Sequence, residues 1–68
     1  MVPGSVRWYV DAWGVPVRFI VDFVNASMSI VRGVSYRGAF VVVSVSHVFE
    51  TLDQAEFYRG KRSFVGGV

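Results

Sequence analysis

The chain has 68 residues and no cysteine, which excludes the disulfide bonds and thiolate metal sites that stabilise many small domains. Its single histidine, His47, leaves too few ligands for a structural zinc site, and we expect no metal or other cofactor. Hydrophobic residues make up 53% of the chain, more than a small globule can easily bury, and the net charge is only +2. We therefore expect one domain over residues 1–68, frayed at residues 1–4 and 65–68, that associates with itself.

The first predicted element is a β-hairpin over residues 6–23. Gly14 and Val15 form its expected two-residue loop, because glycine supplies the positive φ that a type II′ turn requires. One face of this hairpin collects apolar side chains: Val6, Trp8, Val10, Ala12, Val17, Phe19, Val21 and Phe23. The other face carries two opposed charge pairs, Arg7 with Asp22 and Asp11 with Arg18. The register therefore predicts that Trp8 and Phe19 are buried.

The charged face of this hairpin also carries large apolar side chains, which are the predicted protein-binding residues. They are Tyr9, Trp13, Ile20 and Val24. Exposed aromatic and aliphatic groups of this kind mark interfaces, and tryptophan and tyrosine contribute strongly to binding energy. The alternative is that Tyr9 and Trp13 only shield the cross-strand pairs of a small monomer.

The middle of the chain is predicted to contribute two more strands. Residues 26–33 fit a strand or a short helix that ends at Gly33, and their β-branched side chains favour the strand. After a turn at residues 36–39, the run "AFVVVSVSHVF" is predicted to be a strand, whichever structure residues 26–33 adopt. Its unbroken apolar centre is typical of burial on both faces, so we predict a central strand.

The last predicted element is a helix whose N-cap is Thr51, with Gln54 completing a capping box. Leu52 and Ala55 share a face that can cover the sheet, and Gly60 is the expected end. The predicted fold is α+β: a four-stranded antiparallel meander with one C-terminal helix packed on one face.

No pattern in the sequence is typical of catalysis. The residue types of a catalytic triad occur close together, in Ser44, Ser46, His47 and Asp53, but without a nucleophile elbow. Glu50, Asp53 and Glu56 suit the N-terminal end of a helix better than a cation site. We expect that the protein is not an enzyme.

The basic end of the predicted helix indicates an alternative function, the binding of nucleic acid. Its cations alternate with aromatic residues, and phosphate contacts and base stacking require this combination. The candidate residues are Tyr58, Arg59, Lys61 and Arg62 on the helix, and Arg32 and Arg37 would extend them into a basic strip if the third strand lies near the helix end. Acidic residues earlier in the helix oppose this interpretation, and cations in a last helical turn are common without any ligand.

The function that we expect first is binding through protein–protein contacts, with a homodimer or larger oligomer as the working form and another protein as a further partner. Nucleic acid is the alternative partner. We expect no membrane partner, because the longest apolar run, residues 38–49, is too short for a membrane helix. With no visible secretory signal, we expect a soluble cytoplasmic protein. By size and layout alone, the chain is similar to small accessory or inhibitor proteins of phages.

Overall fold

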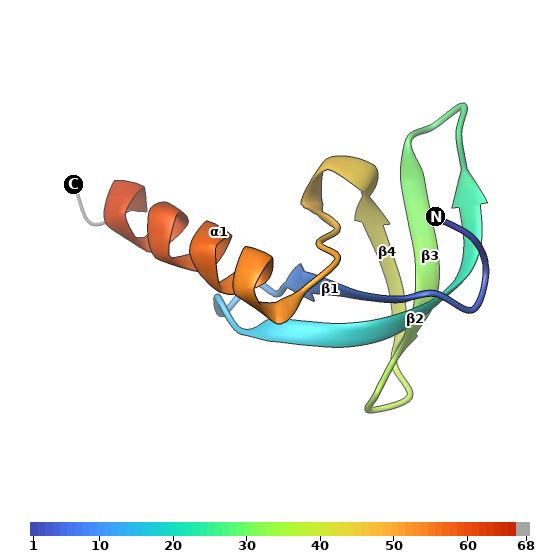
Figure 1. Cartoon of the computed structure of the whole chain (residues 1–68), viewed down its shortest axis with the longest axis horizontal. Coiled ribbons are helices and arrows are strands. Elements are labelled where there is room, and N and C mark those ends of the chain that lie inside the picture. Colours follow the sequence, from blue (N-terminus) through green and yellow to red (C-terminus); the bar gives the residue numbers. More distant parts are fainter. Residues whose placement is uncertain (67–68) are drawn as a thin grey trace.

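The computed structural model describes the backbone of residues 1–66 and the side chains of residues 1–59. Its elements are β1 (Val6–Val10), β2 (Pro16–Asn25), β3 (Ile30–Ser35), β4 (Phe40–Ser44), the short 3₁₀ helix η1 (Val45–His47) and α1 (Leu52–Gly66). The strands form one antiparallel sheet in the order β1-β2-β3-β4 (Figure 1). The predicted meander and C-terminal helix are confirmed. The strand interpretation of residues 26–33 is confirmed from Ile30 onward, whereas residues 26–29 form a turn.

The sheet curls until the chain that follows β4 returns to β1. Phe49 and Trp8 exchange both of their backbone hydrogen bonds, each 2.8 Å long. The long strand β2 sweeps through this curve, and its register with β3 shifts between Val21 and Phe23, as at a β-bulge (Figure 1). The result is a partly closed barrel with an inner and an outer face.

The hydrophobic core lies on the inner face. Its buried members are Phe19, Val21, Val31 and Val41, and the partly buried side chains of Tyr9, Val24, Val43 and Val48 pack around them. Val48 belongs to the segment that returns from η1 to β1, so this segment covers part of the core. The helix α1 contacts β1 and β2, where its residue Ala55 is fully buried.

The predicted register of the first hairpin is wrong by three residues. Arg7 lies opposite Phe19 and Trp8 lies opposite Arg18, where Asp22 and Val21 were expected. Because three is an odd number, the side chains of β1 exchange faces: Tyr9 points into the core and Trp8 points outward. The expected charge pairs of the hairpin are replaced, since the Asp22 carboxylate accepts from Arg32 Nε at 2.9 Å.

The Asp11 side chain explains this register. Its Oδ1 accepts hydrogen bonds from the backbone N–H groups of Trp13 and Val15, each 2.9 Å long. Its carbonyl accepts a third, from the N–H of Gly14 at 3.0 Å. Aspartate in the first position and glycine in the fourth are typical of a type I turn. The carboxylate therefore stabilises a loop over residues 11–15, and the expected pair with Arg18 is lost.

The loop between β3 and β4 repeats this arrangement with a serine in place of the aspartate. Ser35 Oγ accepts from the N–H groups of Arg37 and Ala39, each at 3.3 Å, and its carbonyl accepts from Gly38 at 2.9 Å. The segments "DAWGV" and "SYRGA" thus form the same kind of hairpin loop from the same spacing of polar residue and glycine.

The strand β4 lies at the edge of the sheet, so the predicted central strand is wrong. It ends at Ser44, because the chain must turn through η1 to reach β1. Val41 is buried, whereas Phe40 is 85% exposed and Val42 is 61% exposed. The apolar run is therefore buried on one face only.

The helix α1 begins with the predicted N-cap at Thr51, but the return bond from Gln54 goes to the residue before the cap, so the predicted capping box forms only in part. Thr51 Oγ1 accepts from the N–H of Gln54 at 3.2 Å, and Gln54 Oε1 accepts from the N–H of Glu50 at 2.9 Å. The expected end at Gly60 is wrong, because α1 continues to Gly66; a glycine inside a helix costs about 1 kcal/mol without necessarily ending it. The expected fraying at the C-terminus falls partly on residues 67–68, which lie outside the described residues.

Replacing Thr51 with alanine should lower the free energy of unfolding by about 1 kcal/mol, because the N–H of Gln54 loses its acceptor. Urea denaturation followed by circular dichroism measures this loss. Thr51→Ser is the matched control, since serine keeps the hydroxyl. An equal loss in both variants would contradict the capping role.

Candidate functional site

Two of the predicted protein-binding residues, Tyr9 and Val24, point into the core. The Tyr9 ring meets the Phe19 ring edge-on, with centroids 5.6 Å apart. Burial raises the pKa of the Tyr9 hydroxyl, the nearby Asp11 carboxylate raises it further, and Arg37 opposes both effects. Tyr9 and Val24 are therefore parts of the inner packing and not of a surface.

The other two predicted protein-binding residues are exposed but lie in different places. Trp13 lies in the loop between β1 and β2 and is 86% exposed. Ile20 lies on the outer face of β2 and is about half exposed. The structure therefore does not bring the four residues together, and Ile20 belongs to a surface with other neighbours.

The outer face of the sheet carries side chains in three rows that run across the strands. The first row is Trp8, Arg18 and Tyr36; the second is Val6, Ile20, Val34 and Phe40; the third is Phe23, Arg32 and Val42. Six members with large apolar side chains are exposed by 46% or more: Val6, Ile20, Phe23, Tyr36, Phe40 and Val42. Apolar side chains grouped in this way are typical of interaction surfaces. This surface was missed from the sequence because the predicted register placed Trp8 and Phe23 inside.

The free edge of β4 continues the outer face. Antiparallel strands exchange backbone hydrogen bonds at every second residue. The N–H of Ser35 donates to Ala39 at 2.8 Å, and the N–H of Val45 donates to Ser29 at 2.9 Å, so the odd-numbered residues of β4 face β3. The N–H and C=O groups of Val42, at the centre of the strand, therefore point to the edge where the described part of the chain places no further strand.

Two adjoining hollows lie in the outer face along the first row. Trp8, Pro16, Arg18 and Tyr36 line one of about 250 Å³, and Val6, Arg18, Phe19, Ile20 and Tyr36 line the other, of about 150 Å³. The Arg37 guanidinium lies over the Tyr36 ring, 5.3 Å from its centroid, and its Nε donates to the Tyr36 hydroxyl at 3.0 Å. We call the larger hollow and its walls, Trp8, Pro16, Arg18 and Tyr36, the Trp8–Tyr36 groove.

The predicted nucleic-acid-binding residues are spread over separate parts of the molecule. On the outer face, Arg32 binds Asp22 and lies over the Phe23 ring, 5.2 Å from its centroid. On α1, Arg59 Nη1 lies 3.4 Å from Glu56 Oε2. The side chains of Lys61 and Arg62 lie outside the described residues. Figure 1 shows α1 leading away from the sheet, so its last turns do not extend a strip formed by β3.

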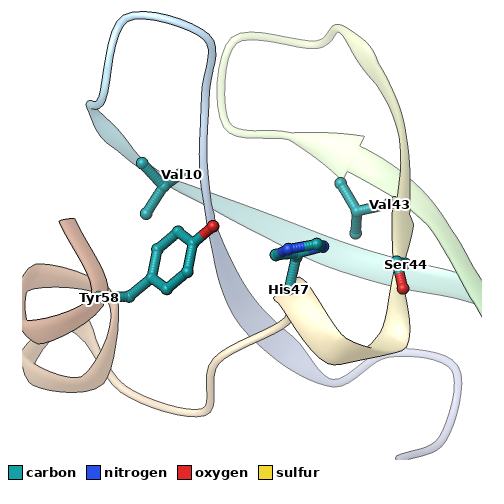
Figure 2. Close-up of a pocket in the computed structure, with 5 residues that line it drawn as sticks. All are labelled: Val10, Val43, Ser44, His47 and Tyr58. Atoms are coloured by element: carbon teal, nitrogen blue, oxygen red, sulfur yellow. The ribbon is translucent and has the colours of Figure 1, made fainter. Parts of the chain in front are cut away.

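A further hollow of about 490 Å³ lies between the ends of β1 and β4, where the barrel is open. Its lining residues are Val10, Val43, Ser44, His47 and Tyr58 (Figure 2). The His47 and Tyr58 rings meet edge-on at 5.8 Å, and the Ser44 hydroxyl pairs with that of Ser46 at 3.0 Å. Among the described side chains, no hydrogen bond joins His47 to a serine or to Asp53, so the triad residue types do not form a triad there.

The part of the chain that the structure describes contains no cluster of three His, Cys, Asp or Glu side chains that could hold a metal ion. It also contains no helix with the length and apolar character needed to cross a bilayer. Comparisons with models of protein families, with curated proteins and with solved structures find no significant match. The function is therefore inferred from the outer face, the β4 edge and the groove.

Proposed function

We propose that the protein is a non-enzymatic binding protein that acts through protein–protein contacts, and that its first partner is a second copy of itself paired along β4. The open edge of β4 carries this proposal. An edge strand with unpaired N–H and C=O groups and exposed apolar side chains is a ready template for another strand. In β4, the exposed apolar side chains are those of Phe40 and Val42.

Pairing of two β4 strands is self-complementary when they run antiparallel about a twofold axis. Such an interface uses the same patch on both copies. Twofold dimers of this kind are the commonest oligomers. With Val42 at the axis, its outward N–H and C=O groups meet those of its counterpart. Val42 then lies beside its counterpart, and Phe40 of each copy lies beside Ser44 of the other, on a continuous outer face. The dimer thus satisfies the backbone of β4 and partly covers the exposed side chains of Phe40 and Val42.

The remainder of the outer face supports a contact with another protein. Val6, Ile20 and Phe23 lie on β1 and β2, away from the β4 edge, and each is about half exposed. A dimer formed through β4 leaves this region uncovered in both copies. A further protein partner would bind at this region of the second and third rows.

Substituting Val42→Lys should weaken self-association by on the order of 100-fold, because two like charges at the axis cost several kcal/mol. Sedimentation equilibrium at micromolar concentration measures the dissociation constant, and circular dichroism confirms the fold. Met28→Lys is the matched control: it adds the same charge at an exposed apolar residue between β2 and β3. A parent protein that stays monomeric at millimolar concentration, or a Val42→Lys variant that associates as well as the parent, would refute the β4 dimer.

A further inference from the structure

We propose that the Trp8–Tyr36 groove binds single-stranded nucleic acid, with bases stacked on Trp8 and Tyr36 and phosphates held by Arg18 and Arg37. The groove lies on β1, β2 and the start of the loop after β3, and it involves no backbone group of the β4 edge. The proposal is therefore independent of the β4 dimer.

The spacing of the aromatic rings supports stacking. Trp8, Arg18 and Tyr36 lie on neighbouring strands of the sheet, joined by the Trp8–Arg18 pair and by the Tyr36 N–H bond to the Arg18 carbonyl at 3.2 Å. Neighbouring strands are about 4.8 Å apart, so the two aromatic residues are separated by roughly 10 Å at the backbone. Two flat rings with a cation between them suit two bases and the phosphate that links them.

The charges around the groove suit a polyanion. The ion pairs among the described side chains join Arg32 to Asp22 and Arg59 to Glu56, so neither Arg18 nor Arg37 is in one of them. Asp22 is the acidic residue of the outer face, and it already binds Arg32. The Asp11 carboxylate accepts hydrogen bonds from its own loop. Arg37 is held against the Tyr36 ring, which places a cation beside a stacking surface.

This site differs from the helix end that the sequence indicated. Arg59 on α1 is paired with Glu56 within the same helix, whereas Arg18 lies between two aromatic walls. An acidic, proline-containing peptide is the competing ligand, because such peptides also dock on aromatic grooves. The two arginines favour nucleic acid, whose phosphates repeat at every nucleotide and make binding strongly dependent on salt.

The two tryptophans of the chain allow a direct test. In a Trp13→Phe background, Trp8 is the remaining tryptophan, so quenching of its fluorescence reports occupation of the groove. The titrant is an oligothymidylate of about 12 nucleotides, within the range that one small domain covers. Its duplex with oligoadenylate and an acidic proline-rich peptide are titrated in parallel.

The expected result is quenching by the single strand at lower concentration than by the duplex or the peptide. Arg18→Gln should reduce the log–log salt slope by about 0.7, the value for one phosphate contact on a single strand. Tyr36→Ala should raise the dissociation constant about tenfold, and Tyr36→Phe much less because the ring remains. Arg59→Gln is the control at the helix end and should change neither the salt slope nor the dissociation constant.

Three results would overturn the proposal. The first is equal affinity for duplex and single strand, which would remove the role of stacking. The second is weaker binding in Arg59→Gln with no effect of Arg18→Gln, which would move the site to α1. The third is quenching by the peptide alone. The same Arg18→Gln comparison made in the Val42→Lys background separates this site from the dimer, since the groove should act in a monomer as well.

Discussion

Replacing Phe19 with alanine should lower the free energy of unfolding by about 3–5 kcal/mol, enough to unfold much of the protein at room temperature. Phe19 is 1% exposed, belongs to the core cluster and meets the Tyr9 ring edge-on. Its truncation removes buried apolar surface and leaves a cavity that the surrounding strands fill only in part. A domain of this length has roughly 3–10 kcal/mol of stability in total, so this one side chain decides whether the sheet persists.

Two controls make the Phe19→Ala result specific. Phe23→Ala removes the same group from the outer face, where Phe23 is about half exposed, and should cost on the order of 1 kcal/mol. Trp8→Ala separates the two hairpin registers, because the predicted register buries Trp8 and the observed one turns it outward beside Arg18. Urea denaturation measures all three. A loss in Trp8→Ala as large as that in Phe19→Ala would contradict the observed register.

The two strands of the first hairpin differ in how well their faces could be predicted. In β2, Val17, Phe19 and Val21 alternate with polar or exposed residues, and all three are buried as expected. In β1, Trp8 and Tyr9 are adjacent and both amphipathic, so alternation alone does not choose between them. The choice is made by the loop chemistry of Asp11, which is visible in the sequence as the type I turn pattern "DAWG".

Contacts between residues close together in the sequence were predictable, and contacts between residues far apart in the sequence were not. The N-cap bond depends on Thr51 and Gln54 alone, and it forms as expected. The position of β4 at the edge depends on the return of Phe49 to Trp8, a contact between residues far apart in the sequence. The outer face needs the registers of three strand pairs and the bulge near Asp22. No local pattern specifies that combination, so the candidate site could not be assembled before the structure.

Replacing Gly33 with alanine should destabilise the protein by about 3 kcal/mol, although alanine is ordinarily the better residue inside a strand. Gly33 is buried in β3 opposite Val21, where β2 bends. A Cβ atom there would overlap the Ile20 carbonyl oxygen and approach Phe19 Cδ2 to 2.7 Å. The carbonyl belongs to the backbone and cannot swing aside, so β2 and β3 would have to separate and loosen the packing of Phe19. A glycine inside a strand is typical of such a close approach.

Gly4→Ala is the matched control for Gly33→Ala. Gly4 has a φ of 92° and no atom within 4 Å of an added Cβ, so this variant carries only the backbone cost of alanine at positive φ, about 1 kcal/mol. Thermal and urea denaturation of both variants measure the difference. A Gly33→Ala variant as stable as the parent would mean that β2 does not bend so closely over β3. The pairing of Ile20 with Val34 and of Phe23 with Arg32 depends on that bend. The same result would therefore also contradict the arrangement of the outer-face side chains in rows.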